Sequence, residues 1–393
     1  MKIIISYPPL NTDKGYPTLG QNRQFQFFKE PTYIYPVIPA TAATLLKQAG
    51  HQVIWNDCIA QGWTYPQFLD FIRKEKPDLI AFETKTPVIK QHWKIINDIK
   101  GLSPQIANPK ETKGTVPKIV LFGDHVTALP EESFQNSPVD FVLTGGDYDF
   151  LLLNLCNFLE SKGLSLTSLS QSQAKGTVPE SIELEPGIYY RENGQIKNSG
   201  KFQLNHDLNS LPFIDRDLTK WQLYAYKNGN YKRTPGTYLM SGRDCWWGSC
   251  SFCSWPQMYT QFRLRNVDNV LDEIGTLIEK YNIREVMDDT GTFPAGDWLR
   301  KFCRGMIERG FNKKIYLDCN MRFGALSSED FSLMKKANFR LLLFGLESAN
   351  QNTLDRINKN LKVERIIQDC QLATKAGLYP HITIMFGLSL IHI

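Results

Sequence analysis

Short apolar runs alternate with longer amphipathic stretches over the first 160 residues. The runs are rich in β-branched residues, and the stretches repeat apolar residues at helical spacing. They predict strands at 2–6, 52–56, 79–83, 118–122 and 141–144, and helices at 39–49, 65–75, 88–99 and 149–159. This alternation is typical of a parallel sheet covered by helices. We therefore predict an α/β, doubly wound domain of flavodoxin-like size over residues 1–160.

Ligands of such a domain bind beyond the carboxyl ends of the strands. The loops that follow the five predicted strands are therefore the ones to inspect: 7–20, 57–63, 84–87, 123–130 and 145–149.

The composition changes to Ser, Gln, Thr, Gly and Pro between residues 161 and 187, as in a linker or a surface insertion. Residues 187–202 then predict a β-hairpin that turns at Asn193-Gly194. We assign residues 161–230 to a linker with this hairpin.

A second alternation of strands and helices fills residues 231–393. Strands are predicted at 237–243, 285–289, 315–320, 340–345 and 381–386, and the clearest helices at 267–281 and 298–309. Five such units predict a partial (β/α)6 barrel, with its reactive groups on loops at the strand ends. Because the sequence stops soon after the fifth strand, we interpret it as truncated at the C-terminus.

The composition fits a globular protein of two domains: 393 residues, 42% apolar and 22% charged. The net charge of +5 is spread along the chain, which argues against a nucleic-acid partner. The N-terminus does not resemble a signal peptide, and no apolar run reaches the ~18 residues of a membrane span. We therefore expect a cytoplasmic protein.

Three of the eight cysteines crowd into one short segment, at Cys245, Cys250 and Cys253. In a chain of this kind the crowding indicates metal or redox chemistry more than a disulfide framework. The other five are scattered, and for each we predict the role of a small buried apolar side chain: Cys58, Cys156, Cys303, Cys319 and Cys370.

Three thiolates in one loop suit an iron–sulfur cluster, zinc or copper(I). A structural zinc site usually has four protein ligands, and no second pair of cysteines follows nearby. The pattern favours a [4Fe–4S] cluster with one iron open to a small ligand. The alternative is a zinc-stabilised binding or scaffold protein without catalysis.

The segment Cys245-Trp-Trp-Gly-Ser-Cys250-Ser-Phe-Cys253 resembles the cluster loop of radical S-adenosylmethionine (SAM) enzymes. The commonest pattern of that family is CxxxCxxC; the longer first gap seen here resembles members with an added cobalamin domain. The segments MDDTGTF (287–293), NMRFG (320–324) and FGLESANQNTLDRINKN (344–360) resemble the regions around the family's second, third and fourth strands. The likeness extends over residues 187–388.

The resemblance implies that Cys245, Cys250 and Cys253 ligate three irons and that the fourth iron binds SAM. A reduced cluster would then cleave SAM to a 5′-deoxyadenosyl radical, with electrons from an external donor such as flavodoxin or ferredoxin. The implied SAM contacts follow three strands: Asp288 or Asp289 for the ammonium group, Arg322 for the carboxylate, and Glu347 with Ser348 for the ribose hydroxyls.

Residues 1–160 resemble the Rossmann-like cobalamin-binding domain that precedes the barrel in some members. The resemblance rests on KIVLFGDHVTALPEE (118–132) and DFVLTGGDYDF (140–150). The DxHxxG motif that supplies a histidine to cobalt is missing after the first strand. Residues implied to face the corrin or its nucleotide tail are Thr84, Thr86, Gly123, His125, Gly145 and Gly146.

These resemblances together imply a cobalamin-dependent radical SAM enzyme. Its reaction would be methyl transfer to a small-molecule substrate, or rearrangement or cyclisation of it. The implied cofactors are a [4Fe–4S] cluster, SAM and cobalamin.

Overall fold

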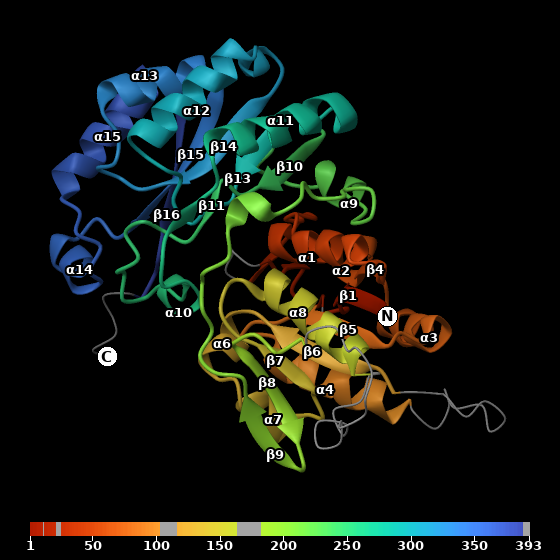
Figure 1. Cartoon of the computed structure of the whole chain (residues 1–393). Helices are drawn as coiled ribbons and strands as arrows, with labels where there is room; N and C mark the ends of the chain where they lie inside the picture. The colour runs from red at the N-terminus through yellow and green to blue at the C-terminus, as the bar shows by residue number, and fades with distance from the viewer. Residues whose placement is uncertain (11, 21–24, 103–115, 163–181, 388–393) are drawn as a thin grey trace. The chain divides into compact units, whose positions relative to one another are not determined.

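The computed structural model describes residues 1–10, 12–20, 25–102, 116–162 and 182–387 (Figure 1). The chain forms two compact units. Unit 1 contains residues 1–206 and 211–223, and unit 2 contains residues 207–210 and 224–393. Most of the predicted linker composition, 163–181, lies outside the described residues. None of the described helices combines the length and apolar character needed to cross a membrane.

Unit 1 is built on a seven-stranded sheet in the order β4-β1-β5-β6-β7-β8-β9. The five parallel strands are β1 (Lys2–Tyr7), β4 (Gln52–Asp57), β5 (Leu79–Glu83), β6 (Lys118–Phe122) and β7 (Phe141–Leu143). All five were predicted, and their order is that of flavodoxin-like doubly wound sheets.

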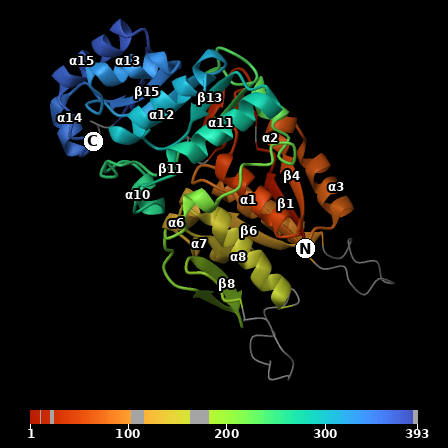
Figure 2. The same cartoon turned by 45° about the horizontal axis from the view of Figure 1, so that its top comes forward.

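Long helices cover both faces of this sheet (Figures 1 and 2). The helices α1 (Val37–Gln48) and α8 (Tyr148–Ser161) lie side by side, and α3 (Tyr65–Glu75) and α4 (Ile89–Gly101) belong to the opposite layer. Apolar side chains of α3 and α4 pack with alternate residues of β1, β5 and β6 in one core cluster. Strands β1, β5, β6 and β7 are buried along almost their whole length, because helices cover both faces of the sheet, and this is why their sequences are continuous apolar runs.

Five short elements that lie between the apolar runs were not predicted, because three to five residues outside such a run carry no readable periodicity. They are β2 (Tyr16–Thr18), β3 (Gln26–Phe28), α2 (Cys58–Gln61), α6 (Asp124–Ala128) and α7 (Glu132–Asn136).

The predicted hairpin is present as β8 (Ile188–Glu192) and β9 (Gln195–Asn198), but it is not part of a free linker. Strand β8 pairs antiparallel with β7, with Leu143 opposite Ile188, and so extends the sheet. Unit 1 therefore continues to residue 206, beyond the predicted boundary at 160.

Unit 2 contains five parallel strands in chain order: β10 (Gly236–Leu239), β13 (Glu285–Asp288), β14 (Tyr316–Met321), β15 (Phe339–Glu347) and β16 (Tyr379–Ile384). Its longer helices are α11 (Val267–Tyr281), α12 (Asp297–Glu308), α13 (Ser328–Lys336) and α15 (Val363–Lys375). The strands follow one another in chain order, and parallel neighbours of this kind are joined by right-handed crossovers. The connecting helices therefore lie on one face of this sheet, as Figure 1 shows. This is the strand and helix order of part of a β/α barrel.

Shorter elements complete the described chain: α9 (Gln222–Ala225), α10 (Trp255–Met258), α14 (Gln351–Arg356), and the 3₁₀ turns Leu208–Ser210 and Phe311–Lys313.

The strand predicted at 237–243 is two strands. The extended strand is interrupted after β10, where the backbone N–H of Ser241 donates to Asp288 Oδ2 at 3.0 Å. It resumes as β11 (Gly242–Arg243), which pairs antiparallel with β12 (Arg263–Leu264). The break turns the chain out of the parallel sheet immediately before the first of the clustered cysteines.

Candidate active site

The three clustered cysteines lie in a loop that the β11–β12 ladder closes at its base. Gly242 permits this closure, because a Cβ there would lie 2.5 Å from the carbonyl oxygen of Arg263. Asp244 begins the loop at φ 81°, and its Oδ1 accepts from the N–H of Cys245 at 2.6 Å. The ladder and this turn direct Cys245 into the loop.

All three thiols are half-buried. Burial raises the pKa of Cys253 to about 11, and the neighbouring Cys250 and Cys245 thiols raise it further. Burial also raises the pKa of Cys250, with Lys359 opposing and Cys245 reinforcing the shift. The three thiols are thus near enough to influence one another. Cys245 Sγ also lies 2.9 Å from Thr292 Oγ1.

Four of the five scattered cysteines are buried, as predicted, and Cys370 is half-buried. Burial raises the pKa of the Cys303 thiol to about 12, so it stays protonated near neutral pH. Among the cysteines that the structure describes, only the three loop thiols are both close to one another and accessible to a ligand.

Within the described ranges, no three side chains of His, Cys, Asp or Glu come together closely enough to hold one metal ion.

Arg322, which follows β14, places a cation beside the thiols. Its guanidinium lies over the ring of Trp247 at 4.4 Å, and its Nη2 donates to the carbonyl oxygens of Lys359 and Asn360. Burial lowers the pKa of Arg322, while Cys250 and Cys245 raise it. Its Nη1 is buried without a hydrogen-bond partner among the described residues. This donor suits a carboxylate ligand.

Glu347 ends β15 with φ 63°, a left-handed conformation that is uncommon for a residue with a side chain. Its Oε1 accepts from Lys359 Nζ at 2.9 Å. The adjacent Ser348 is half-buried, and its Oγ accepts from the N–H of Asn350 at 3.1 Å. The strand end therefore presents one carboxylate in a fixed ion pair.

Asp288 and Asp289 follow β13 and are buried. Asp288 Oδ1 accepts from the N–H of Thr290 at 2.9 Å, and Oδ2 accepts from the N–H and the hydroxyl of Ser241. Burial raises the pKa of Asp288 to about 6 against the effect of these donors. Asp288 therefore organises the chain that leads into the cysteine loop. Asp289 donates its N–H to Leu239 O at 2.8 Å.

The polar side chains implied to face cobalamin contact other parts of unit 1. Thr84 Oγ1 lies 2.9 Å from His92 Nδ1, and Thr86 Oγ1 lies 3.1 Å from His125 Nδ1. His125 Nε2 lies 2.9 Å from Glu132 Oε2. These contacts give the two threonines and His125 structural roles within the domain.

The glycines at the same sheet edge are also explained by packing. A Cβ on Gly123 would lie 2.3 Å from the carbonyl oxygen of Thr84, and one on Gly145 would lie 2.5 Å from the ring of Phe202. Both have positive φ. The packing of the chain itself therefore explains Gly123 and Gly145, and their presence is not evidence for or against a corrin. Gly146 is buried beside them.

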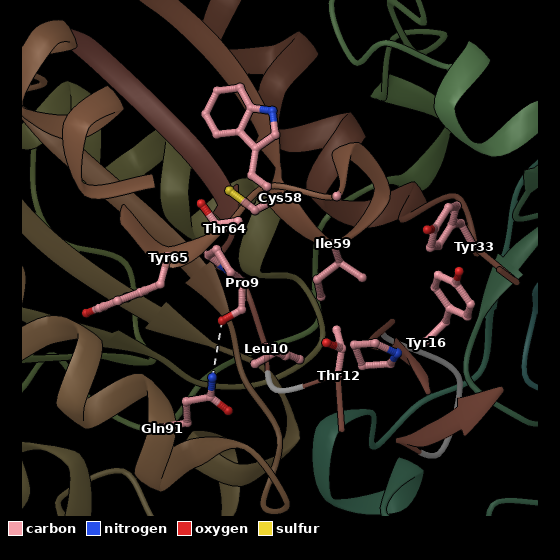
Figure 3. A pocket seen from close by; sticks show the side chains of 13 residues that line it. Pro9, Leu10, Thr12, Tyr16, Tyr33, Cys58, Ile59, Thr64, Tyr65 and Gln91 are labelled. Atoms are coloured by element: carbon pink, nitrogen blue, oxygen red, sulfur yellow. Dashed lines mark hydrogen bonds between the residues drawn. The ribbon is translucent and has the colours of Figure 1, made fainter. Parts of the chain in front are cut away.

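A cavity of about 390 Å³ lies at the carboxyl end of β1 and β4 in unit 1. Figure 3 shows Tyr16 and Tyr33 close together on one side, and the amide of Gln91 donating to Pro9 O at 3.2 Å. None of the six residues implied for cobalamin lines it. The lining residues are Pro9, Leu10, Thr12, Tyr16, Pro17, Tyr33, Cys58, Ile59, Gly62, Trp63, Thr64, Tyr65 and Gln91.

Residues 239–390 match the family model described as the Radical SAM superfamily. Residues 239–390 form a radical SAM domain. The match includes the cysteine loop and strands β13 to β16, whose ends carry Arg322 and Glu347. A domain of this kind implies a [4Fe–4S] cluster and SAM as cofactors.

Longer proteins resemble this chain over most of its length. It is 24% identical to an uncharacterised methyltransferase of Pyrococcus horikoshii, over 88% of this chain and 67% of that protein. It is 23% identical to the anaerobic magnesium-protoporphyrin IX monomethyl ester cyclase of Cereibacter sphaeroides, over 89% of this chain and 53% of the cyclase. This chain thus spans about half to two thirds of these relatives.

The structure of OxsB, a cobalamin-dependent S-adenosylmethionine radical enzyme with aqua-cobalamin bound, has the same fold with a TM-score of 0.72. The sequences are 17% identical, and the likeness covers 98% of this chain and 49% of OxsB.

Several side chains at the radical SAM site were not singled out from the sequence. Lys359, Thr292 and Asn358 reach the cysteine loop from distant segments. Each lies inside a segment that resembles the family, 287–293 or 344–360, but only the folded arrangement distinguishes it from its neighbours there.

Proposed function

We propose that the chain binds a [4Fe–4S] cluster through Cys245, Cys250 and Cys253 and uses it to cleave SAM. When bound and reduced by an external donor, the cluster would supply one electron to the SAM sulfonium, and cleavage of the C5′–S bond would give methionine and a 5′-deoxyadenosyl radical. The observation that carries this proposal is a loop with three interacting, half-buried thiols beside two cations, within a radical SAM domain.

In this proposal the chain orients SAM by charge. The buried Nη1 of Arg322 donates to the SAM carboxylate, and Glu347 Oε2 accepts from a ribose hydroxyl while Oε1 stays with Lys359. Asp288 or Asp289, at the end of β13, accepts from the ammonium group. Ser348 assists Glu347 at the ribose.

The proposed reaction class is methyl transfer to a small-molecule carbon, or cyclisation, with cobalamin bound by unit 1. Support comes from the OxsB-like fold and from the methyltransferase and cyclase relatives. The side chains implied to contact cobalamin engage partners within unit 1, so this part of the proposal rests on likeness to those proteins.

The cluster is tested by measuring iron, sulfide and visible spectra on protein reconstituted without oxygen. We expect about four irons per chain, and 5′-deoxyadenosine when reductant and SAM are added. Cys250→Ala loses both, whereas Cys370→Ala, which changes a half-buried cysteine outside the loop, keeps both. One zinc per chain without SAM cleavage would support the scaffold alternative.

Cobalamin is tested separately by gel filtration after incubation with hydroxocobalamin. Co-elution in stoichiometric amount supports the proposed role of unit 1. Complete separation would remove cobalamin from the proposal and leave the cluster and SAM unaffected.

A further inference from the structure

The segment Ile357–Asn360, between α14 and α15, is bound to the cysteine loop. The N–H of Ser251 donates to Ile357 O at 3.0 Å, and Trp247 Nε1 donates to Asn358 O at 2.9 Å. In the other direction, Asn358 Nδ2 donates to Ser249 O at 2.9 Å. Three hydrogen bonds thus hold this segment against the part of the loop that runs from 247 to 251.

The backbone of the segment is shaped for this contact. Asn358 and Asn360 have φ of 54° and 49°, the left-handed conformation that asparagine tolerates best among residues with side chains. Lys359 lies between them, and its carbonyl oxygen accepts from Arg322. The conformation of this turn therefore sets the direction in which the Lys359 side chain extends from the backbone.

The ammonium of Lys359 is held from two sides. Its Nζ donates to Glu347 Oε1 at 2.9 Å and lies 5.8 Å from the ring centre of Phe252, the residue before Cys253. The side chain of Lys359 is 10% exposed, and that of Glu347 is 11% exposed. A charge so shielded from water and salt acts strongly on its neighbours.

The neighbours on which it acts are the thiols. Phe252 lies between Cys250 and Cys253, and the segment that carries Lys359 is hydrogen-bonded to Ser251 and Trp247 of the same loop. The ammonium therefore lies beside the part of the loop that carries two of the three proposed cluster ligands.

We propose that Lys359 is a positioning residue: it raises the reduction potential of the cluster and fixes Glu347 for SAM. The inference rests on the proposed function. A fixed positive charge stabilises the added electron of a reduced cluster, since net charge near the sulfurs sets its potential. The same ammonium donates to Glu347 Oε1 and so leaves Oε2 to accept from a ribose hydroxyl of SAM.

The test is an EPR-monitored redox titration of the reconstituted cluster in Lys359→Met, Lys359→Arg and Lys375→Met. Lys375 is an exposed lysine of α15 and serves as the matched control. We expect K359M to move the midpoint to a more negative potential, and K359R and K375M to stay near the wild type. Glu347→Gln, which leaves the Lys359 charge uncompensated, should move it in the opposite direction.

SAM affinity of the oxidised cluster protein, measured by titration calorimetry, provides a second readout. K359M should bind SAM at least several-fold more weakly than K375M. Midpoints for K359M and E347Q that both match the wild type would overturn the role of Lys359. If K359M fails to load iron, a wild-type midpoint for E347Q alone would overturn it. Failure of the wild type to form any cluster would instead overturn the proposed function, and this inference with it.

Discussion

Arg340 is a single side chain that holds two buried acids at the start of three adjacent strands. One of its terminal nitrogens, Nη2, lies 2.7 Å from Glu285 Oε1 and 2.7 Å from Asp318 Oδ2. Glu285 also accepts from the backbone N–H groups of Lys232 and Arg233. Burial, and then Glu285, raise the pKa of Asp318 well above its usual range, and Arg340 opposes this.

Replacing Arg340 by Met should lower the free energy of unfolding by about 3 to 5 kcal/mol, because two carboxyl groups are left buried without their cation. Urea unfolding followed by circular dichroism measures the change. Arg304→Met, at an exposed position of α12, is the control and should stay within about 0.5 kcal/mol of the wild type. Equal stability of the two variants would contradict the role given to Arg340.

At the scale of elements, the two-residue strands β11 and β12 matter more than their length suggests. They are the only paired backbone at the base of the cysteine loop that the described residues contain. Their contact depends on Gly242, whose missing side chain leaves room for Arg263 O and for the Leu264 side chain.

Gly242→Ala should therefore separate β11 from β12 and loosen the loop. We expect the variant to lose most of its iron on desalting after reconstitution, and to lose about 1 to 3 kcal/mol of stability through overpacking. Gly101→Ala, where an added Cβ meets nothing within 4 Å, should retain iron like the wild type. Full iron retention in G242A would show that the ladder is not needed.

The elements that the sequence predicted well are those with many repeats of one pattern. The helix predicted at 267–281 matches α11 residue for residue, since fifteen residues carry four turns of apolar spacing. Strand β11 and the hairpin of β2 and β3 have two or three residues each and offer no period. The three cysteines were found by spacing, but Lys359 was not, because its partner Glu347 and the loop thiols meet it only after folding.

At the scale of the whole chain, the first crossing from unit 1 to unit 2 comes directly after His206. Its imidazole stacks on Phe150 at 4.1 Å, and its two nitrogens lie 3.1 Å from Asp147 Oδ2 and 2.9 Å from Glu185 Oε2. Burial alone would lower the pKa of His206, but these two carboxylates outweigh it and raise the pKa to about 9. The charged ring therefore secures the end of unit 1.

This tie makes stability depend on pH. The unfolded pKa of histidine is about 6.5, so the contribution is complete below that pH and is lost as the pH rises through the folded value of about 9. We expect His206→Gln to be less stable than the wild type by about 1 to 2 kcal/mol near pH 6.5, and the difference to shrink towards pH 10. Urea unfolding at several pH values measures it; a constant difference would contradict the assignment.

The bonds between the cysteine loop and Ile357–Asn360 also impose an order on biosynthesis. Ser249 and Asn358 are 109 positions apart, so a ribosome completes the whole cysteine loop long before it makes the segment that holds it. The nascent thiols have neither the Lys359 charge nor the Asn358 tether while strands β13 to β15 are being added. In the proposed function, delivery of iron and sulfide therefore follows the synthesis of residues 357–360, and until then the three thiols need a reducing environment.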